Sequence, residues 1–180
     1  MPELVFDATP LIHFARADRL DVLGDLMSPR RCATTSAVRE EIMHGGSIHP
    51  HLHDVLDLEW IEVLTLDDPA RLLRFSDWMR RVGVTDSGRN IGEASVFAIA
   101  EEFQATAVVD DRDAVRVARR HGVTVHGTVW LLARECSDGK LTETNACNII
   151  DALKDTEMRL PCTGMEFPRY AASHGLKNWR

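Results

Sequence analysis

Residues 92–120 read GEASVFAIAEEFQATAVVDDRDAVRVARR, and this stretch decides the predicted fold. Its first part carries apolar residues at helical spacing, and Glu93 shares their face of the helix. The apolar run at 106–109 then has the length of a buried strand and ends at Asp110 and Asp111. Acids at the end of such a strand lie at the edge of a sheet, where ligands and metal ions are commonly bound.

Short apolar segments alternate with helical segments along the rest of the chain. The strands expected from this pattern are 4–6, 32–35, 60–64, 106–109 and 123–125. The alternation predicts an α/β architecture with a mostly parallel central sheet. Because the carboxyl ends of parallel strands share one edge, Asp7, which follows the first strand, should lie on the same side as Asp110 and Asp111.

A further acid is expected on the helix that follows residues 32–35, where Thr35 or Ser36 can cap the first turn. Val38, Glu41 and Ile42 fall at i, i+3 and i+4, so Glu41 lies on the apolar face. A salt bridge or a backbone contact at the rim of the core explains such an acid as well as a functional role does.

Glu93 and the arginines after Asp111 also have structural explanations. The spacing from Asn90 to Glu93 is that of a capping box, in which the acid reaches back to the Asn90 amide. The arginines line one side of the helix after Asp111 and form either a solvated face or a stripe that contacts phosphates. They are Arg112, Arg116, Arg119 and Arg120.

The beginning of the chain and its loops complete the outline. Thr9 is placed to cap a helix that has Pro10 at its first position. The segment 44–54, HGGSIHPHLHD, contains His44, His49, His51 and His53; it reads as a solvated loop, although alternating histidines can also chelate a metal. The four cysteines have no CxxC pair, so reduced and mostly buried thiols are expected.

Length and composition fit an ordinary globular protein of one core, with 180 residues, 44% hydrophobic and 27% charged. The net charge of -7 argues against a surface that binds polyanions everywhere, but a local basic stripe can still attract nucleic acid. No apolar run has the length of a membrane span, and the first residues lack a signal sequence, so a cytoplasmic location is expected.

A cluster of these acids requires a cation or protons. Two carboxylates about 4 Å apart repel each other by roughly 4 kcal/mol at an effective dielectric near 20. Oxygen ligands without matching His or Cys favour the hard ions Mg²⁺ or Mn²⁺. Such an ion lowers the pKa of a bound water, orients it for attack on a phosphodiester and neutralises charge on the phosphate oxygens.

Several motifs in order resemble the PIN domain family of metal-dependent nucleases, and in particular the branch of the VapBC toxins. The motifs are VFDATPLIHFA, VREEI, GEASVFAIA, AVVDDRDAVRVARRHGV and GTVWLL, and the similarity covers about residues 3–155. The resemblance implies a three-layer α/β/α fold and an acidic pocket that binds Mg²⁺ or Mn²⁺ and cleaves RNA. Many relatives have aspartate where this chain has Glu93, a longer side chain that changes the fit of a metal.

The resemblance assigns roles to positions of this sequence. The expected catalytic acids are Asp7, Glu41, Glu93 and Asp111, with Asp110 as an alternative or auxiliary metal ligand; Thr9, Arg112 and Arg116 are expected to contact the substrate. The expected nuclease domain covers 1–155, and 156–180 form a helical extension packed on it. Expected partners are RNA, an antitoxin protein and a second copy of the chain.

Two other functions fit parts of the pattern. One is a catalytically inactive PIN-like module that binds RNA or protein. The other is a phosphotransfer domain, either a phosphatase like the haloacid dehalogenases or a receiver. The phosphatase requires a second aspartate two residues after Asp7, where this chain has Thr9. The receiver requires an acidic pair at the N-terminus and a partner lysine, and the sequence offers neither pattern.

Overall fold

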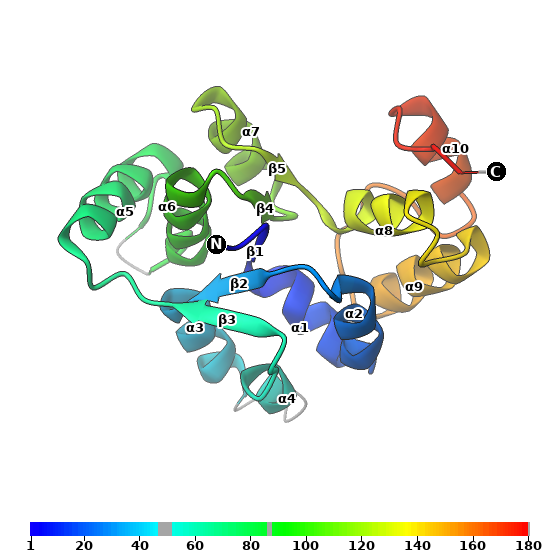
Figure 1. Ribbon diagram of the computed structural model, residues 1–180, viewed down its shortest axis with the longest axis horizontal. Helices are drawn as coiled ribbons and strands as arrows, with labels where there is room; N and C mark the ends of the chain where they lie inside the picture. Colours follow the sequence, from blue (N-terminus) through cyan, green and yellow to red (C-terminus); the bar gives the residue numbers. More distant parts are fainter. Residues whose placement is uncertain (47–51, 86–87, 180) are drawn as a thin grey trace.

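A computed structural model describes residues 1–46, 52–85 and 88–179, which form an α/β/α sandwich around five parallel strands (Figure 1). The strands are β1 (Leu4–Phe6), β2 (Cys32–Thr35), β3 (Ile61–Leu64), β4 (Thr106–Val108) and β5 (Val125–His126). Their order in the sheet is β3-β2-β1-β4-β5. The expected three-layer α/β/α fold is therefore confirmed, and every strand pair in the described sheet is parallel.

β1 lies at the centre of the sheet. Leu4 is opposite Cys32 on one side and Thr106 on the other. All three β1 residues are completely buried, as expected for a strand with a neighbour on each edge and helices on each face. The parallel register brings the carboxyl ends of β1 and β4 side by side, and the Asp7 amide continues the ladder by donating to the Val108 carbonyl at 3.1 Å.

The helices cover both faces of the sheet. Figure 1 shows α5 and α6 as a pair at one end of the molecule and α8, α9 and α10 as a group at the other. In chain order the helices are α1 (Ala8–Arg16), α2 (Leu20–Met27), α3 (Ser36–Gly46), α4 (His53–Leu56), α5 (Pro69–Val82), α6 (Ile91–Phe103), α7 (Arg112–Arg120), α8 (Thr128–Ser137), α9 (Glu143–Asp155) and α10 (Phe167–Ser173). None of the helices in the described ranges has the length and apolar character needed to cross a bilayer.

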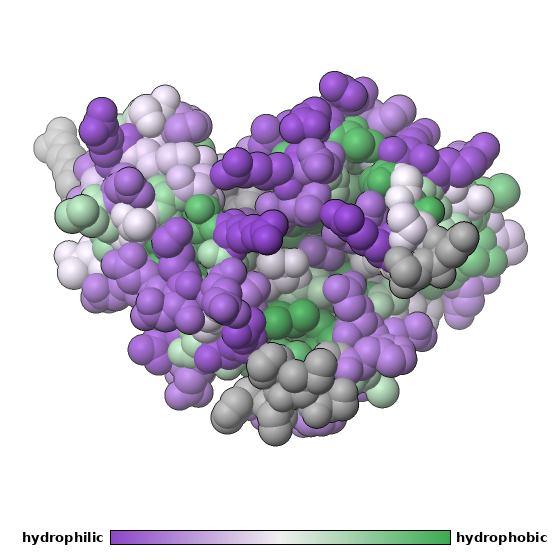
Figure 2. Space-filling view, turned by 180° about the vertical axis from the view of Figure 1, so that it is seen from behind, coloured by the Kyte–Doolittle hydropathy of each residue, from purple (hydrophilic) through white to green (hydrophobic). Residues whose placement is uncertain are grey.

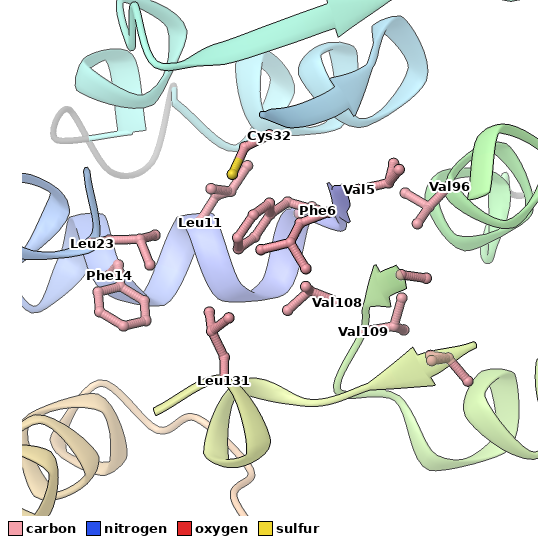
Figure 3. Packing of buried hydrophobic residues seen from close by; sticks show 14 of the residues in the cluster. Val5, Phe6, Leu11, Phe14, Leu23, Cys32, Val96, Val108, Val109 and Leu131 are labelled. Atoms are coloured by element: carbon pink, nitrogen blue, oxygen red, sulfur yellow. The ribbon is translucent and has the colours of Figure 1, made fainter. Parts of the chain in front are cut away.

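The core is continuous from α2 through the sheet to α8. Figure 3 shows Phe6 and Val108 of the two central strands among side chains from α1 and α8, including Leu11 and Leu131. Burying a side chain of this size contributes about 1.5–3 kcal/mol. Trp60 also meets Phe6 edge to face at 6.0 Å, so the segment before β3 closes one side of the core.

Two expected element boundaries are wrong. α1 begins at Ala8, so Asp7 occupies the N-cap position instead of Thr9, and Pro10 is the third helical residue. Proline is tolerated there because the first amides of a helix have no intrahelical acceptor. β5 begins at Val125, two residues later than expected, because Val123 still belongs to the turn that ends α7. The Val123 amide donates to the Ala118 carbonyl at 3.1 Å. Gly122, the residue before it, makes this turn with φ +80°.

The chain after α9 folds back on the body of the molecule. Phe167 of α10 is completely buried and stacks on Trp179 at 5.8 Å between ring centroids. α10 packs against α9. The boundary between 1–155 and 156–180 stays a prediction.

Two minor expectations can also be compared with the structure. Cys32, Cys136 and Cys162 are buried and Cys147 is partly buried, all as free thiols. In the histidine-rich segment, His44 belongs to α3 and His53 begins α4, while His49 and His51 lie outside the described residues. The alternative of a histidine metal site in this segment therefore stays open.

Candidate active site

Asp7 is the most deeply buried acid of the site. It follows β1 directly, has only 3% of its surface exposed, and precedes the first turn of α1. The carbonyl of Phe6 before it accepts a hydrogen bond from Thr34 Oγ1 at 2.9 Å. The end of β1 is thus held from β2 by this bond and from β4 by the Asp7 amide bond, which fixes the position of the Asp7 carboxylate.

Glu41 reaches the same place from α3. An added Cβ at Gly92 would lie 2.7 Å from Glu41 Oε2 and 3.3 Å from Asp7 Oδ1, so both carboxylates border the space over this glycine. Thr35 caps the helix that carries Glu41, since its Oγ1 accepts from the Val38 amide at 3.2 Å. Glu41 as a whole is exposed, whereas Val38 and Ile42 on the same helix are buried. Glu41 therefore lies at the rim of the core and not within the apolar face of α3.

Glu93 lies in the first turn of α6, one residue after Gly92, and is partly buried. The capping box at this turn is not formed by Asn90. Asn90 has φ +69°, its side chain makes no cap hydrogen bond, and its Nδ2 donates to the Val82 carbonyl at 3.1 Å. The side chain of Asn90 therefore anchors the start of α6 to the end of α5.

The three acids disfavour one another's charge. Burial raises the pKa of Asp7 well above its ordinary value, and Glu93 and Glu41 raise it further, against a smaller lowering by the amides of Ala8 and Thr9. Although Glu41 as a whole is exposed, partial desolvation of its carboxyl group at the space over Gly92, and then Glu93, raise the pKa of Glu41. Burial raises the pKa of Glu93, and Asp111 adds to this while Arg89 opposes it. Asp7, Glu41, Glu93 and Asp111 thus form one electrostatic group, which a cation would stabilise in its charged form.

Asp110 and Asp111 have different surroundings although they are adjacent. Asp110 Oδ1 accepts from the Thr128 amide at 2.9 Å and Asp110 Oδ2 accepts from Thr128 Oγ1 at 2.7 Å. Thr128 is the first residue of α8 and not its cap, because its hydroxyl is used by Asp110. Asp111 is exposed and caps α7 through Oδ1, which accepts from the amides of Asp113 and Ala114 at 2.9 and 2.8 Å.

A chain of buried hydroxyls supports the site, and sequence reasoning missed most of it. Thr35 Oγ1 lies 2.6 Å from Ser95 Oγ, which donates to the Gly92 carbonyl at 2.6 Å. The chain joins the end of β2 to the turn that carries Gly92 and Glu93. The available signal was Ser95, a small polar residue in the otherwise apolar run 94–100, and it is completely buried.

Comparison with known proteins agrees with this arrangement. A family model described as a PIN domain matches residues 3–166. The chain belongs to the PIN domain family. No curated protein matches the chain. The matched range contains all five strands and all five acids of the predicted site.

Membership of the PIN domain family gives the chain the fold of a nuclease family. The remaining residues that were predicted to contact the substrate have different surroundings in this PIN domain. Thr9 is in the first turn of α1, where its amide lowers the pKa of Asp7. Arg116 pairs with Asp113 of its own helix at 3.0 Å. Arg112 lines a separate cavity with Asp110 and Arg119.

The acids of this PIN domain fit a hard divalent cation, because their carboxylates offer only oxygen atoms as metal ligands. The pKa values of the three acids are raised, first by burial and then by neighbouring carboxylates, and a nearby cation would oppose both effects. In the described ranges, however, no three side chains of His, Cys, Asp or Glu are close enough together to form a ready ligand set. Asp7 and Glu41, which share the space over Gly92, are the nearest approach to one.

Proposed function

We propose that the protein is a metal-dependent endoribonuclease that hydrolyses phosphodiester bonds and uses Mg²⁺ or Mn²⁺. The observation that carries the proposal is that the Asp7 and Glu41 carboxylates border one space over Gly92. The raised pKa values of these two acids and of Glu93 support it, because a bound cation stabilises the charged forms that desolvation and the neighbouring carboxylates disfavour.

Each acid has a defined part in the proposal. Asp7 is the fixed ligand, since the ends of β1, β2 and β4 hold it in place. Glu41 and Glu93 extend from α3 and α6, and their side chains are longer than that of Asp7 by one methylene group. Asp111 contributes from the N-cap position of α7. The cation, when bound, activates water and neutralises charge on the phosphate. Asp110 has a structural part in the proposal, because both its oxygens accept hydrogen bonds from Thr128 and hold the start of α8.

The biological setting is proposed from the resemblance to the VapBC toxins. The protein would act on RNA as a toxin, and an antitoxin would block it with a basic side chain placed among the acids. A second copy of the chain, a cytoplasmic location and the division into 1–155 and 156–180 belong to the same proposal. The family match supports the nuclease part and ends at residue 166, within the proposed extension.

The test is cleavage of single-stranded and structured RNA by the purified protein with Mn²⁺ or Mg²⁺, and with EDTA. The wild type should cut in the presence of either metal ion. Asp7→Asn should reduce the rate roughly 100-fold or more, the scale of losing one preorganised charged group, while circular dichroism shows an intact fold. Equal rates for the two proteins would reject the proposal and favour a PIN-like module that binds RNA or protein without cutting.

A further inference from the structure

A cavity lies at the same edge of the sheet as the acids. It has a volume of about 370 Å³ and is lined at the ends of β4 and β5 by Asp110, His126 and Gly127. The rest of the lining comes from α7, α8 and the segment around α10. Figure 2 shows the molecule from behind, with a notch in its outline between α7 and α10 and hydrophilic side chains along its sides. The volume lies within the range of about 300–1,000 Å³ in which pockets enclose small ligands.

The cavity carries an excess of positive charge. Arg112 and Arg119 line it from α7, and Arg159 lines it from the segment before α10. Within the described part of the chain none of the three forms an ion pair with a carboxylate, and Arg119 donates to the Val125 carbonyl at 3.2 Å. Asp110, the acid of the lining, has its oxygens bound by Thr128. Three guanidinium groups therefore stand at the cavity against one carboxylate, so its lining keeps an excess of positive charge.

Two stacked ring pairs border the same cavity. His126 and Trp130 lie parallel, with 4.1 Å between ring centroids and 9° between ring planes. Tyr170 of α10 and His174, the C-cap of this helix, stack at 4.0 Å with 23° between their planes. Arginines together with aromatic rings are the combination that holds single-stranded nucleic acid, because guanidinium groups bind phosphate and rings stack on bases.

We propose that this cavity binds one nucleotide of the RNA strand, with its phosphate at Arg112, Arg119 and Arg159 and its base against the ring pairs. The inference rests on the proposed ribonuclease function, because it places a binding site for the same substrate next to the acids. Asp110 lines the cavity, and Asp111, the next residue, acts electrostatically on Glu93. A strand that leaves the cavity along the sheet edge thus arrives at the acids.

The test measures RNA binding without cleavage. A fluorescein-labelled single-stranded RNA octamer is titrated with the full-length protein in EDTA, and anisotropy is followed at several salt concentrations. Arg112→Ala/Arg159→Ala should weaken binding about tenfold and reduce the salt slope by about 0.7, the value for the one phosphate contact on a single strand. The control Arg31→Ala/Arg169→Ala removes the same charge from exposed positions outside the cavity and should change affinity less than threefold.

A third pair separates the cavity from the outer face of α7. Arg116→Ala/Arg120→Ala should weaken binding less than the cavity pair does, because Arg120 and Arg116 do not line the cavity. Equal or greater weakening by this pair, or by the control pair, would overturn the inference. Tyr170→Leu should weaken binding about tenfold through lost stacking. Unchanged affinity in this variant would remove the role of the rings and overturn the inference as stated.

Competitors identify the chemistry of the ligand. AMP should displace the RNA at lower concentrations than inorganic phosphate, since only AMP offers a base. Displacement by a glutamate octapeptide as effective as by unlabelled RNA would overturn the inference in favour of an acidic protein partner. Failure of the proposed function is seen separately: wild type that binds RNA through the cavity but does not cut with Mn²⁺ rejects the nuclease and leaves the cavity assignment standing.

Discussion

Glu41 and Asp7 come from different layers of the fold, yet their carboxylates border one space over the backbone of Gly92. A Cβ at position 92 would lie 2.7 Å from Glu41 Oε2 and 3.3 Å from Asp7 Oδ1. Glycine here is a requirement of the site rather than of the backbone, because residue 92 is a helical residue of α6. Any side chain at this position would occupy the space that the two acids share.

Gly92→Ala should therefore separate activity from stability. Alanine is a better helix former than glycine, by up to about 1 kcal/mol in a helix interior, and the atom it meets at 2.7 Å is the end of the flexible Glu41 side chain, while Asp7 Oδ1 at 3.3 Å has to give by only a few tenths of an ångström. We expect an unfolding temperature equal to or above that of the wild type, with metal affinity and RNA cleavage reduced at least tenfold. Thermal unfolding and manganese titration of the same sample check this. A variant that is unstable, or one that is fully active, would contradict the shared space.

Asp7→Asn should stabilise the metal-free protein at neutral pH. The pKa of Asp7 is raised above its ordinary value of 3.8 by burial, Glu93 and Glu41. The stability that comes from its proton is present in full below pH 3.8 and is lost as pH rises through the folded-state pKa. Each pH unit between the two pKa values costs about 1.4 kcal/mol.

The comparison is made by thermal unfolding of wild type and Asp7→Asn in EDTA between pH 4 and 8. The advantage of the variant should grow as the pH rises, because asparagine stays neutral like the protonated acid. Saturating Mn²⁺ should stabilise the wild type alone, adding about 2.7 kcal/mol to its free energy of unfolding at 100 times Kd and so raising its unfolding temperature. Parallel curves for the two proteins in EDTA would show that Asp7 is not destabilised by its neighbours.

The aspartate doublet should divide into a structural and a functional acid. Asp111→Asn keeps an effective cap for α7, since asparagine caps as well as aspartate, so stability should change by less than about 0.5 kcal/mol while manganese affinity falls. Thr128→Val removes the 2.7 Å hydrogen bond to Asp110 and should cost about 1–3 kcal/mol with manganese affinity unchanged. The opposite pattern in calorimetry and urea unfolding would assign Asp110 to the metal.

A buried ion pair away from the site provides an independent check of the fold. Arg30 Nη1 lies 2.7 Å from Glu135 Oε1, and Glu135 is completely buried. Lys140 adds a weaker contact to the same acid at 3.7 Å. Arg30→Ala should lower the free energy of unfolding by about 3–5 kcal/mol, because it leaves a buried charge short of its partner. Arg30→Met/Glu135→Leu should recover most of this loss in urea unfolding, because it removes both charges. A loss as large as that of Arg30→Ala would contradict the description of Arg30 and Glu135 as a buried ion pair.

The sequence predicted the layers and the strand ends well because both depend on local patterns. Apolar runs that stop at Asp7 and at Asp110 mark the carboxyl ends of β1 and β4, and the parallel order of the sheet then brings these ends together. The helical spacing that placed Glu93 beside buried Val96 and Phe97 also agrees with the structure.

What the sequence could not predict depends on contacts between distant segments. The separate surroundings of Asp110 and Asp111 follow from Thr128, which arrives at the start of α8, and no spacing within the doublet indicates it. The hydroxyl partner of Ser95, a residue of α6, is Thr35 at the end of β2. The start of α1 at Ala8 was missed because Thr9 and Pro10 form a common capping pattern that the β1 connection overrides.

The central claim is that these acids hold one divalent cation, and calorimetric titration of Mn²⁺ into the metal-free protein at pH 7 tests it most directly. The account predicts saturable binding by the wild type, loss of binding in Asp7→Asn, and at least tenfold weaker binding in Glu41→Gln and in Glu93→Gln. Glu143 lies at the start of α9 and pairs with Lys177, away from the acids, so the control Glu143→Gln should bind Mn²⁺ as the wild type does. Wild-type protein that takes up no Mn²⁺, or Asp7→Asn that binds it equally well, would contradict the account.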